Sequence, residues 1–182
     1  ANTGGIIQAL DARTGNLIWE HHVGADIAPR GIVLYGNKLI FQSAEEWAVR
    51  PQEAHLVALD AATGELLWNV KMPDVYATNS GPLVANGLLI QGMGTCTVYE
   101  SNKCFISAYD PQTGEQKWRF RTVALDGEKG GDSWGGLPDL YRAGAESWIT
   151  GSFDPDLGLT YWGTTQAKPW MPASRGMKGT DV

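Results

Sequence analysis

The sequence has few cysteines, few histidines and no excess of positive charge. Its 182 residues include two Cys, three His, and 14 Lys and Arg against 20 Asp and Glu. Because the basic residues are scattered singly, no continuous basic stripe is available to neutralise phosphates. Apolar runs such as 31–35 and 88–90 have the length of a strand, whereas a bilayer needs about 18 to 20 apolar residues. We therefore expect neither a nucleic-acid partner nor a membrane span.

Other kinds of site are also missing. Two cysteines without His or Cys partners at ligand spacing argue against a structural zinc site, and no Cys-x-x-Cys-His haem motif occurs. His21, His22 and His55 do not form a metal or acid–base group by their spacing. The first residues have neither the basic start nor the apolar core of a secretory signal. Either a signal was removed or the chain begins inside a longer protein.

What the sequence does contain is a repeat. An 11-residue frame, Ala-x-Asp-x-x-Thr-Gly-x-x-x-Trp, begins at Ala9, Ala58 and Ala108, and its Asp recurs after 49 and then 50 residues. A period in this range indicates a repeat architecture. The 23 Gly and eight Trp are typical of β repeats in which aromatic side chains pack against tight turns.

Each repeat predicts four short strands. An apolar run leads into the Asp-x-x-Thr-Gly turn, and the returning strand ends near the Trp. A second hairpin follows around Gly36-Asn37 or Asn86-Gly87. Four strands per period make one propeller blade. We predict an all-β fold, a β-propeller of four-stranded blades with about three to four blades present, its repeats lying near 5–54, 55–103 and 104–170.

Closed propellers usually have about four to eight blades, so this chain is expected to be a piece of a larger ring. Residues 171–182 then form a truncated connection to a missing blade. A second hypothesis is self-association, in which two copies complete a propeller. The third repeat is interrupted at 126–136, where a Gly-rich insertion is long enough to be a functional loop.

Together these residues resemble the pyrroloquinoline quinone (PQQ)-dependent alcohol and sugar dehydrogenases. The 11-residue frame is similar to the family's tryptophan-docking motif, which implies that Trp19, Trp68 and Trp118 pin neighbouring blades together. Two further stretches, 130–135 and 148–170, are similar to enzymes of the family rather than to non-catalytic propellers. The resemblance implies an eight-bladed ring, of which about half is present, with PQQ at its axis.

Four residues stand where the family binds PQQ. Arg30 matches an Arg that holds cofactor carboxylates, as a planar guanidinium can, and Trp148 matches the Trp on which the quinone stacks. Asn79 and Gly94 fall near a Thr and a Ser that contact the cofactor. The alternatives are a surface Arg, a core Trp, and polar turn residues at the other two positions.

The resemblance also implies Ca²⁺ beside PQQ, but the ligands depart from the family pattern. Gln166 stands at the position of an Asn ligand and could offer its carbonyl oxygen. The family's Glu ligand is not retained near Thr97, and Glu146 replaces a Thr two residues before the stacking Trp. We therefore expect calcium, if bound, to be held differently, with Gln166 as a ligand.

Cys96 and Cys104 are eight residues apart, a spacing that suits a disulfide closing a hairpin loop. An even cysteine count in an exported protein favours this pairing over the alternative, two reduced cysteines in the core.

The resemblance implies oxidation of an alcohol, sugar or aldehyde with hydride transfer to PQQ. The expected electron acceptor is a cytochrome or a quinone, and the expected location is the periplasm or outside the cell. The family's catalytic Asp is expected beyond Val182, so the chain alone should be inactive. The alternative function is a non-catalytic propeller that serves as a protein-interaction scaffold in the cell envelope.

Overall fold

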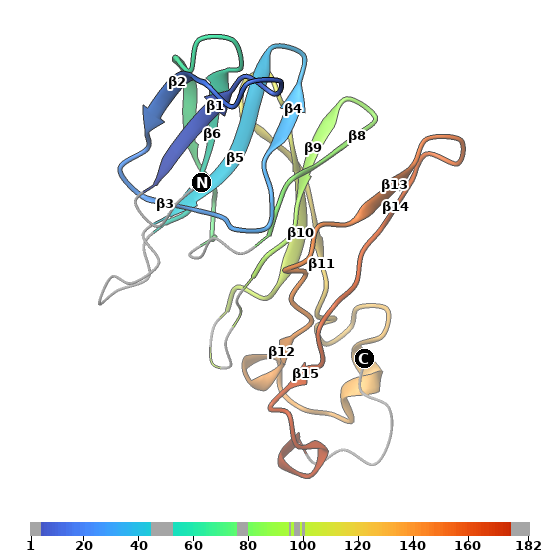
Figure 1. Cartoon of the computed structure of the whole chain (residues 1–182). Coiled ribbons are helices and arrows are strands. Elements are labelled where there is room, and N and C mark those ends of the chain that lie inside the picture. Colours follow the sequence, from blue (N-terminus) through green and yellow to red (C-terminus); the bar gives the residue numbers. More distant parts are fainter. Residues whose placement is uncertain are drawn as a thin grey trace.

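The computed structural model describes residues 5–44, 53–75, 80–94, 96, 99 and 101–175, and their regular secondary structure is almost entirely β (Figure 1). The strands of the first half are β1 (Ile6–Leu10), β2 (Leu17–His22), β3 (Asp26–Ile27), β4 (Val33–Tyr35), β5 (Lys38–Ala44), β6 (His55–Asp60) and β7 (Leu66–Lys71). Those of the second half are β8 (Leu83–Ala85), β9 (Leu88–Gln91), β10 (Phe105–Tyr109), β11 (Gln116–Arg121), β12 (Ala143–Gly144), β13 (Ser152–Asp154), β14 (Leu159–Tyr161) and β15 (Ala167–Lys168). Three short 3₁₀ helices complete the structure: η1 (Gly131–Trp134), η2 (Asp139–Tyr141) and η3 (Pro172–Arg175).

Two complete antiparallel blades lie side by side. One is formed by β4, β5, β6 and β7, with β3 also pairing with β5, and the other by β8, β9, β10 and β11. Hairpins β1–β2 and β13–β14 flank them as two-stranded sheets (Figure 1). The predicted all-β propeller fold is confirmed. The four strands of one sequence period are shared between two neighbouring sheets, because the chain passes from one blade to the next after each Trp-bearing strand.

The repeated Asp-x-x-Thr-Gly segments form the same turn three times. In the first, the Asp11 carboxylate accepts hydrogen bonds from the Thr14 amide (2.8 Å) and hydroxyl (3.0 Å), while the Gly15 amide donates to the Asp11 carbonyl at 2.8 Å. The bonds from the Thr14 amide and hydroxyl, with a third from the Arg13 amide, hold the pKa of Asp11 below its ordinary value. Gly15 has a φ of +74°, a conformation that glycine adopts without a Cβ penalty. The turn is therefore stabilised by residues close together in the sequence.

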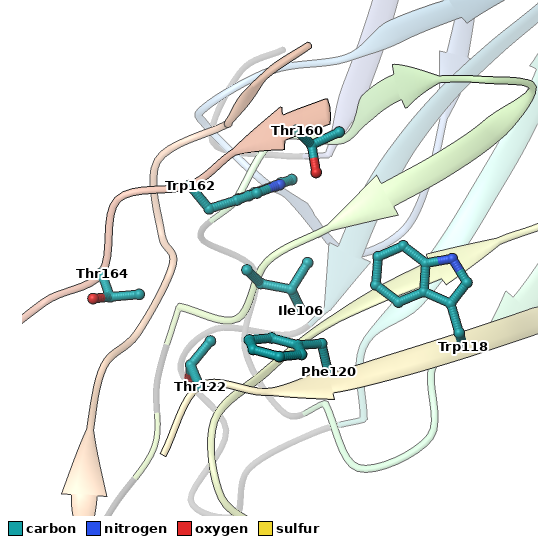
Figure 2. A pocket seen from close by; sticks show the side chains of 7 residues that line it. All are labelled: Ile106, Trp118, Phe120, Thr122, Thr160, Trp162 and Thr164. Carbon is teal, nitrogen blue, oxygen red and sulfur yellow. The ribbon is translucent and has the colours of Figure 1, made fainter. Parts of the chain in front are cut away.

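The Trp at the end of each of the first two frames reaches the turn of the next repeat. Trp19 donates a hydrogen bond from Nε1 to the Ala61 carbonyl at 3.2 Å, and its ring lies so close to Gly64 that a Cβ there would be 2.5 Å from a ring carbon. The Trp68 ring also approaches the next turn, where a Cβ at Gly114 would be 3.1 Å from a ring carbon. Trp118 instead lines a mostly apolar cavity of about 320 Å³ and is 39% exposed (Figure 2). In the described part of the chain, no fourth turn of this type covers it.

The middle strands carry the core. β5, β6 and β10 are buried along nearly their whole length, whereas the outer strands β2, β7 and β11 are mostly exposed. A continuous apolar run is typical of a strand covered on both faces. The largest core cluster includes residues of both complete blades and continues to Ala145 and Ala167. The segments around Ala145 and Ala167, which carry the candidate site, are therefore packed against the core of the two blades. In the described residues, no helix is long and apolar enough to span a membrane.

Candidate functional site

The candidate site lies where β12 pairs with β15. Ala143 lies opposite Lys168 and Gly144 opposite Ala167, which brings the segment after β12 beside the segment before β15. Gly144 has a φ of +98°, and a Cβ at this position would lie 2.3 Å from the Gln166 carbonyl oxygen. The close approach of the two segments therefore requires glycine at position 144.

Beside this pairing lies a cavity of about 290 Å³. Four segments of the chain contribute to its wall: those after β3, after β9 and after β12, and the segment around β15. Its lining residues are Arg30, Gly94, Glu146, Trp148, Thr165, Gln166, Lys168 and Trp170. Four residues proposed from the sequence, Arg30, Gly94, Trp148 and Gln166, are therefore brought to one cavity.

Arg30 and Trp148 are in direct contact. The guanidinium carbon of Arg30 lies 4.4 Å from the centre of the Trp148 ring, a cation–π geometry. Nearby, the Thr150 hydroxyl donates to the Gly81 carbonyl at 3.0 Å and lies 3.4 Å from the Arg30 carbonyl. These contacts connect the segment that carries Trp148 to the segments that carry Gly81 and Arg30. Trp148 is 37% exposed, so it is not a core residue. The guanidinium thus lies over one face of the Trp148 indole, and both groups line the cavity.

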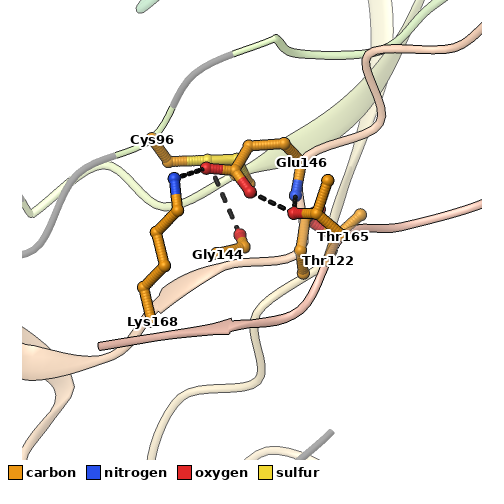
Figure 3. Close-up of a disulfide and its surroundings, with 8 residues drawn as sticks. Cys96, Thr122, Gly144, Glu146, Thr165 and Lys168 are labelled. Atoms are coloured by element: carbon orange, nitrogen blue, oxygen red, sulfur yellow. Dashed lines mark hydrogen bonds and ion pairs between the residues drawn. A yellow bond between two sulfur atoms is a disulfide. The ribbon is translucent and has the colours of Figure 1, made fainter. Parts of the chain in front are cut away.

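Glu146 is the buried carboxylate of the cavity. Its side chain is 4% exposed; Oε1 forms an ion pair with Lys168 Nζ, and Oε2 accepts a hydrogen bond from the Thr165 hydroxyl (Figure 3). The Glu146 amide donates to the same hydroxyl at 3.1 Å. Burial raises the pKa of Glu146, but the hydrogen bonds from Lys168 and Thr165 outweigh burial and hold the pKa below its ordinary value. Glu146 is therefore a carboxylate with both oxygens engaged.

Cys96 and Cys104 form a disulfide next to Glu146, with their Cα atoms 5.6 Å apart and both residues buried (Figure 3). The two sulfurs and a Glu146 carboxylate oxygen lie within 4.8 Å of one another. Sulfurs bonded to each other are not thiolates, and thiolates are the form that binds metals. This group is therefore a structural staple beside the carboxylate.

The Gly-rich insertion does not line this cavity. Trp134, within it, is buried. Arg142, which follows it, is buried as well and donates to the Leu137 carbonyl at 2.7 Å and the Ala124 carbonyl at 3.0 Å. These bonds satisfy a buried guanidinium and fix the loop against the sheet. In this structure the insertion packs against the blade, and none of its residues lies among those that line the cavity.

The other residues proposed from the sequence lie partly outside the described part of the chain. Asn79 and Thr97 lie outside the described residues. Gln166 lines the cavity and is exposed. Sequence reasoning assigned no role to Thr165, Lys168 or Trp170, although all three fall in the stretch 148–170 that carries the family resemblance. Gln166, Lys168 and Trp170 are two residues apart, the spacing that places side chains on one face of a strand, so this signal could have grouped Lys168 and Trp170 with Gln166, but not Thr165.

Comparison with known proteins agrees with this fold. Residues 1–176 match the family model described as PQQ, glucose/ethanol/alcohol dehydrogenase, β-propeller domain. The chain is 31% identical, over 89% of its length, to the quinoprotein alcohol dehydrogenase PedH of Pseudomonas putida, of which it covers 30%. It therefore spans less than a third of that relative.

Solved structures show the same relation. The quinohemoprotein alcohol dehydrogenase of Comamonas testosteroni superposes with a TM-score of 0.74 at 28% identity, covering 97% of this chain and 28% of that one. BamB of Moraxella catarrhalis superposes with a TM-score of 0.58 at 18% identity, covering 89% of this chain and 38% of that one. At 18% identity, the similarity to BamB shows a shared fold only.

Proposed function

The chain belongs to the PQQ family of glucose/ethanol/alcohol dehydrogenase β-propeller domains, and from this membership we propose that it is part of a PQQ-dependent dehydrogenase acting on an alcohol, sugar or aldehyde. The observation that carries the proposal is the contact between Arg30 and Trp148 at the cavity. A planar, multiply charged quinone cofactor needs an aromatic face and a cation close together.

Arg30 and Trp148 have complementary roles in this proposal. The indole of Trp148 offers a flat surface on which a tricyclic ring system stacks. The guanidinium of Arg30 donates paired hydrogen bonds to a carboxylate and keeps its charge at any physiological pH. Lys168 adds a second cation at the same cavity. PQQ, when bound, supplies the quinone that accepts hydride from the substrate; these residues bind and orient it.

The described part of the chain offers no free general base at this cavity. Glu146 is the one carboxyl group among the lining residues, and its oxygens are engaged by Lys168 and Thr165. A carboxylate with a lowered pKa and two partners is a poor proton acceptor. We therefore propose that this chain binds the cofactor, and that substrate deprotonation needs an Asp from outside it.

The test is cofactor binding rather than turnover. Quenching of Trp fluorescence by added PQQ should saturate for the full chain, and Arg30→Ala should weaken binding by about tenfold to a hundredfold, because a hydrogen bond to a charged group contributes about 1.5–3 kcal/mol. Trp148→Ala should weaken it by about tenfold. The matched controls are Arg13→Ala and Trp118→Phe, which lie outside the cavity and should leave the affinity unchanged.

Two outcomes would contradict the proposal. Absence of saturable binding would favour the alternative, a non-catalytic propeller scaffold. Turnover of alcohols by the chain with PQQ alone would show that the base is present, against the incomplete site proposed here.

Location and partners follow from the same proposal. The Cys96–Cys104 disulfide favours an oxidising compartment, such as the periplasm or the outside of the cell. The electrons that bound PQQ would take from a substrate would need an acceptor, and we propose a cytochrome or a quinone for this role.

A further inference from the structure

We propose that Lys168, and not a divalent cation, neutralises the buried carboxylate of this cavity, so that the cavity binds an anionic planar ligand without Ca²⁺. Binding of an anionic planar ligand rests on the proposed function, whereas neutralisation of the carboxylate depends only on Glu146 and Lys168.

The first observation is that both oxygens of the buried carboxylate already have a partner. Lys168 Nζ is paired with Oε1, and the Thr165 hydroxyl donates to Oε2 (Figure 3). The Thr165 hydroxyl is itself oriented, because it accepts the Glu146 amide at 3.1 Å. A cation at this carboxylate would have to displace the ammonium or the hydroxyl from a side chain that is 4% exposed. Leaving such a partner unpaired is costly in a buried site.

The second observation is that the other oxygen donors are too few. Ca²⁺ takes six to eight oxygen ligands at about 2.3–2.6 Å. Among the described residues that line the cavity, the remaining side-chain oxygen is that of Gln166, which is exposed. Nearby sulfurs are joined in the disulfide and offer no thiolate. The described side chains that line the cavity therefore do not by themselves supply the six to eight oxygens of the calcium site that the family resemblance implies.

The third observation is charge. Arg30 and Lys168 both line the cavity, against the single carboxylate of Glu146. A divalent cation would be placed beside an ammonium and repelled by it, whereas an anionic ligand would be attracted. Lys168 is 26% exposed, so the ammonium held by Glu146 remains accessible from the cavity. Lys168 thus supplies a positive charge that is covalently part of the chain, whereas the charge of a bound metal ion would be lost when the ion dissociates.

The metal arm of the test needs no cofactor. Thermal unfolding of the full chain is followed in EDTA and in increasing CaCl₂, with MgCl₂ as the control for ionic strength. We expect the same Tm in all three solutions. A Tm that rises with CaCl₂ in the millimolar range or below, and not with MgCl₂, would overturn the proposal.

The ligand arm uses PQQ. Affinity should be equal in EDTA and in CaCl₂, Lys168→Met should weaken it by at least tenfold, and Lys168→Arg should restore most of it. Binding that requires CaCl₂, or a Lys168→Met chain that binds as tightly as the unaltered one, would overturn the proposal. If Lys168→Met does not fold, the comparison of EDTA with CaCl₂ on the unaltered chain still decides. If PQQ does not bind at all, the proposed function fails, and the calcium titration still tests the cation.

Discussion

The three Asp-x-x-Thr-Gly turns and the Glu146 cavity are stabilised by different kinds of contact. In each turn, a carboxylate is satisfied by amides two or three residues away, on the surface. At the cavity, the Glu146 carboxylate is satisfied by Thr165 and Lys168, 19 and 22 residues away, in a buried place. A local turn can form in any blade, whereas the cavity exists only once the strands have paired. The repeat therefore specifies the scaffold, and the interrupted region specifies the site.

The largest expected difference is between the free energies of unfolding lost when Glu146, at the cavity, and Glu65, at the surface, are each replaced by Ala. Glu146→Ala leaves Lys168 without its partner, and losing one member of a buried pair costs about 3–5 kcal/mol. Because Lys168 is 26% exposed, we expect the low end, about 3 kcal/mol. Glu65→Ala, at an exposed turn position, should change the free energy of unfolding by less than about 0.5 kcal/mol. Urea denaturation measures both; equal losses would show that the pair at the cavity contributes no more than a surface charge.

A smaller effect separates two glycines of the repeat. Gly15 and Gly64 have nearly the same φ, +74° and +78°, but a Cβ at Gly64 would be 2.5 Å from the Trp19 ring, whereas nothing lies within 4 Å at Gly15. Both Ala substitutions cost about 1–2 kcal/mol for the left-handed backbone. Gly64→Ala should cost about 2 kcal/mol more, because the ring must move. If the two variants unfold at the same urea concentration, the Trp19 contact does not hold the blades together.

The smallest effect is the pH dependence of the turns. The hydrogen bond from the Ala62 amide, with those from the Asn37 side chain and the Thr63 amide, lowers the pKa of Asp60 against the opposing effect of desolvation. The resulting stability is therefore present above the ordinary value of 3.8 and is lost as the pH falls through the lowered folded pKa. The Tm difference between the chain and its Asp60→Asn variant should shrink between pH 6 and pH 2.5. A difference that stays constant over this range would contradict this origin.

Sequence reasoning recovered the scaffold because its signals are local. The Asp and Gly of each frame fix a turn and a reversal, and the Trp of the first two frames contacts the next turn. The repeat period and the second hairpin of each repeat then suffice to predict an all-β propeller. The blade boundaries could not be predicted from the repeat. The strands of one sequence period can belong to one blade or be divided between two, and only the pairing of the strands shows which.

The site was recovered only in part. Arg30 and Trp148 were placed by resemblance, and their contact at 4.4 Å depends on strand pairing that no local pattern encodes. The role of Lys168 could not be read from the sequence, because a single Lys near a strand end is ordinary unless its partner is known. Glu146 was noticed as a departure from the family, and its meaning emerged only from the buried pair that it forms.

We propose that Arg30 and Trp148 form one binding site for PQQ, and a crystal structure of the full chain grown with PQQ and EDTA would reveal that site. We expect a flat tricyclic density stacked on the Trp148 ring, with a carboxylate within hydrogen-bonding distance of the Arg30 guanidinium and no metal beside it. Cofactor density elsewhere, or a cavity that stays empty at saturating PQQ, would overturn the proposal.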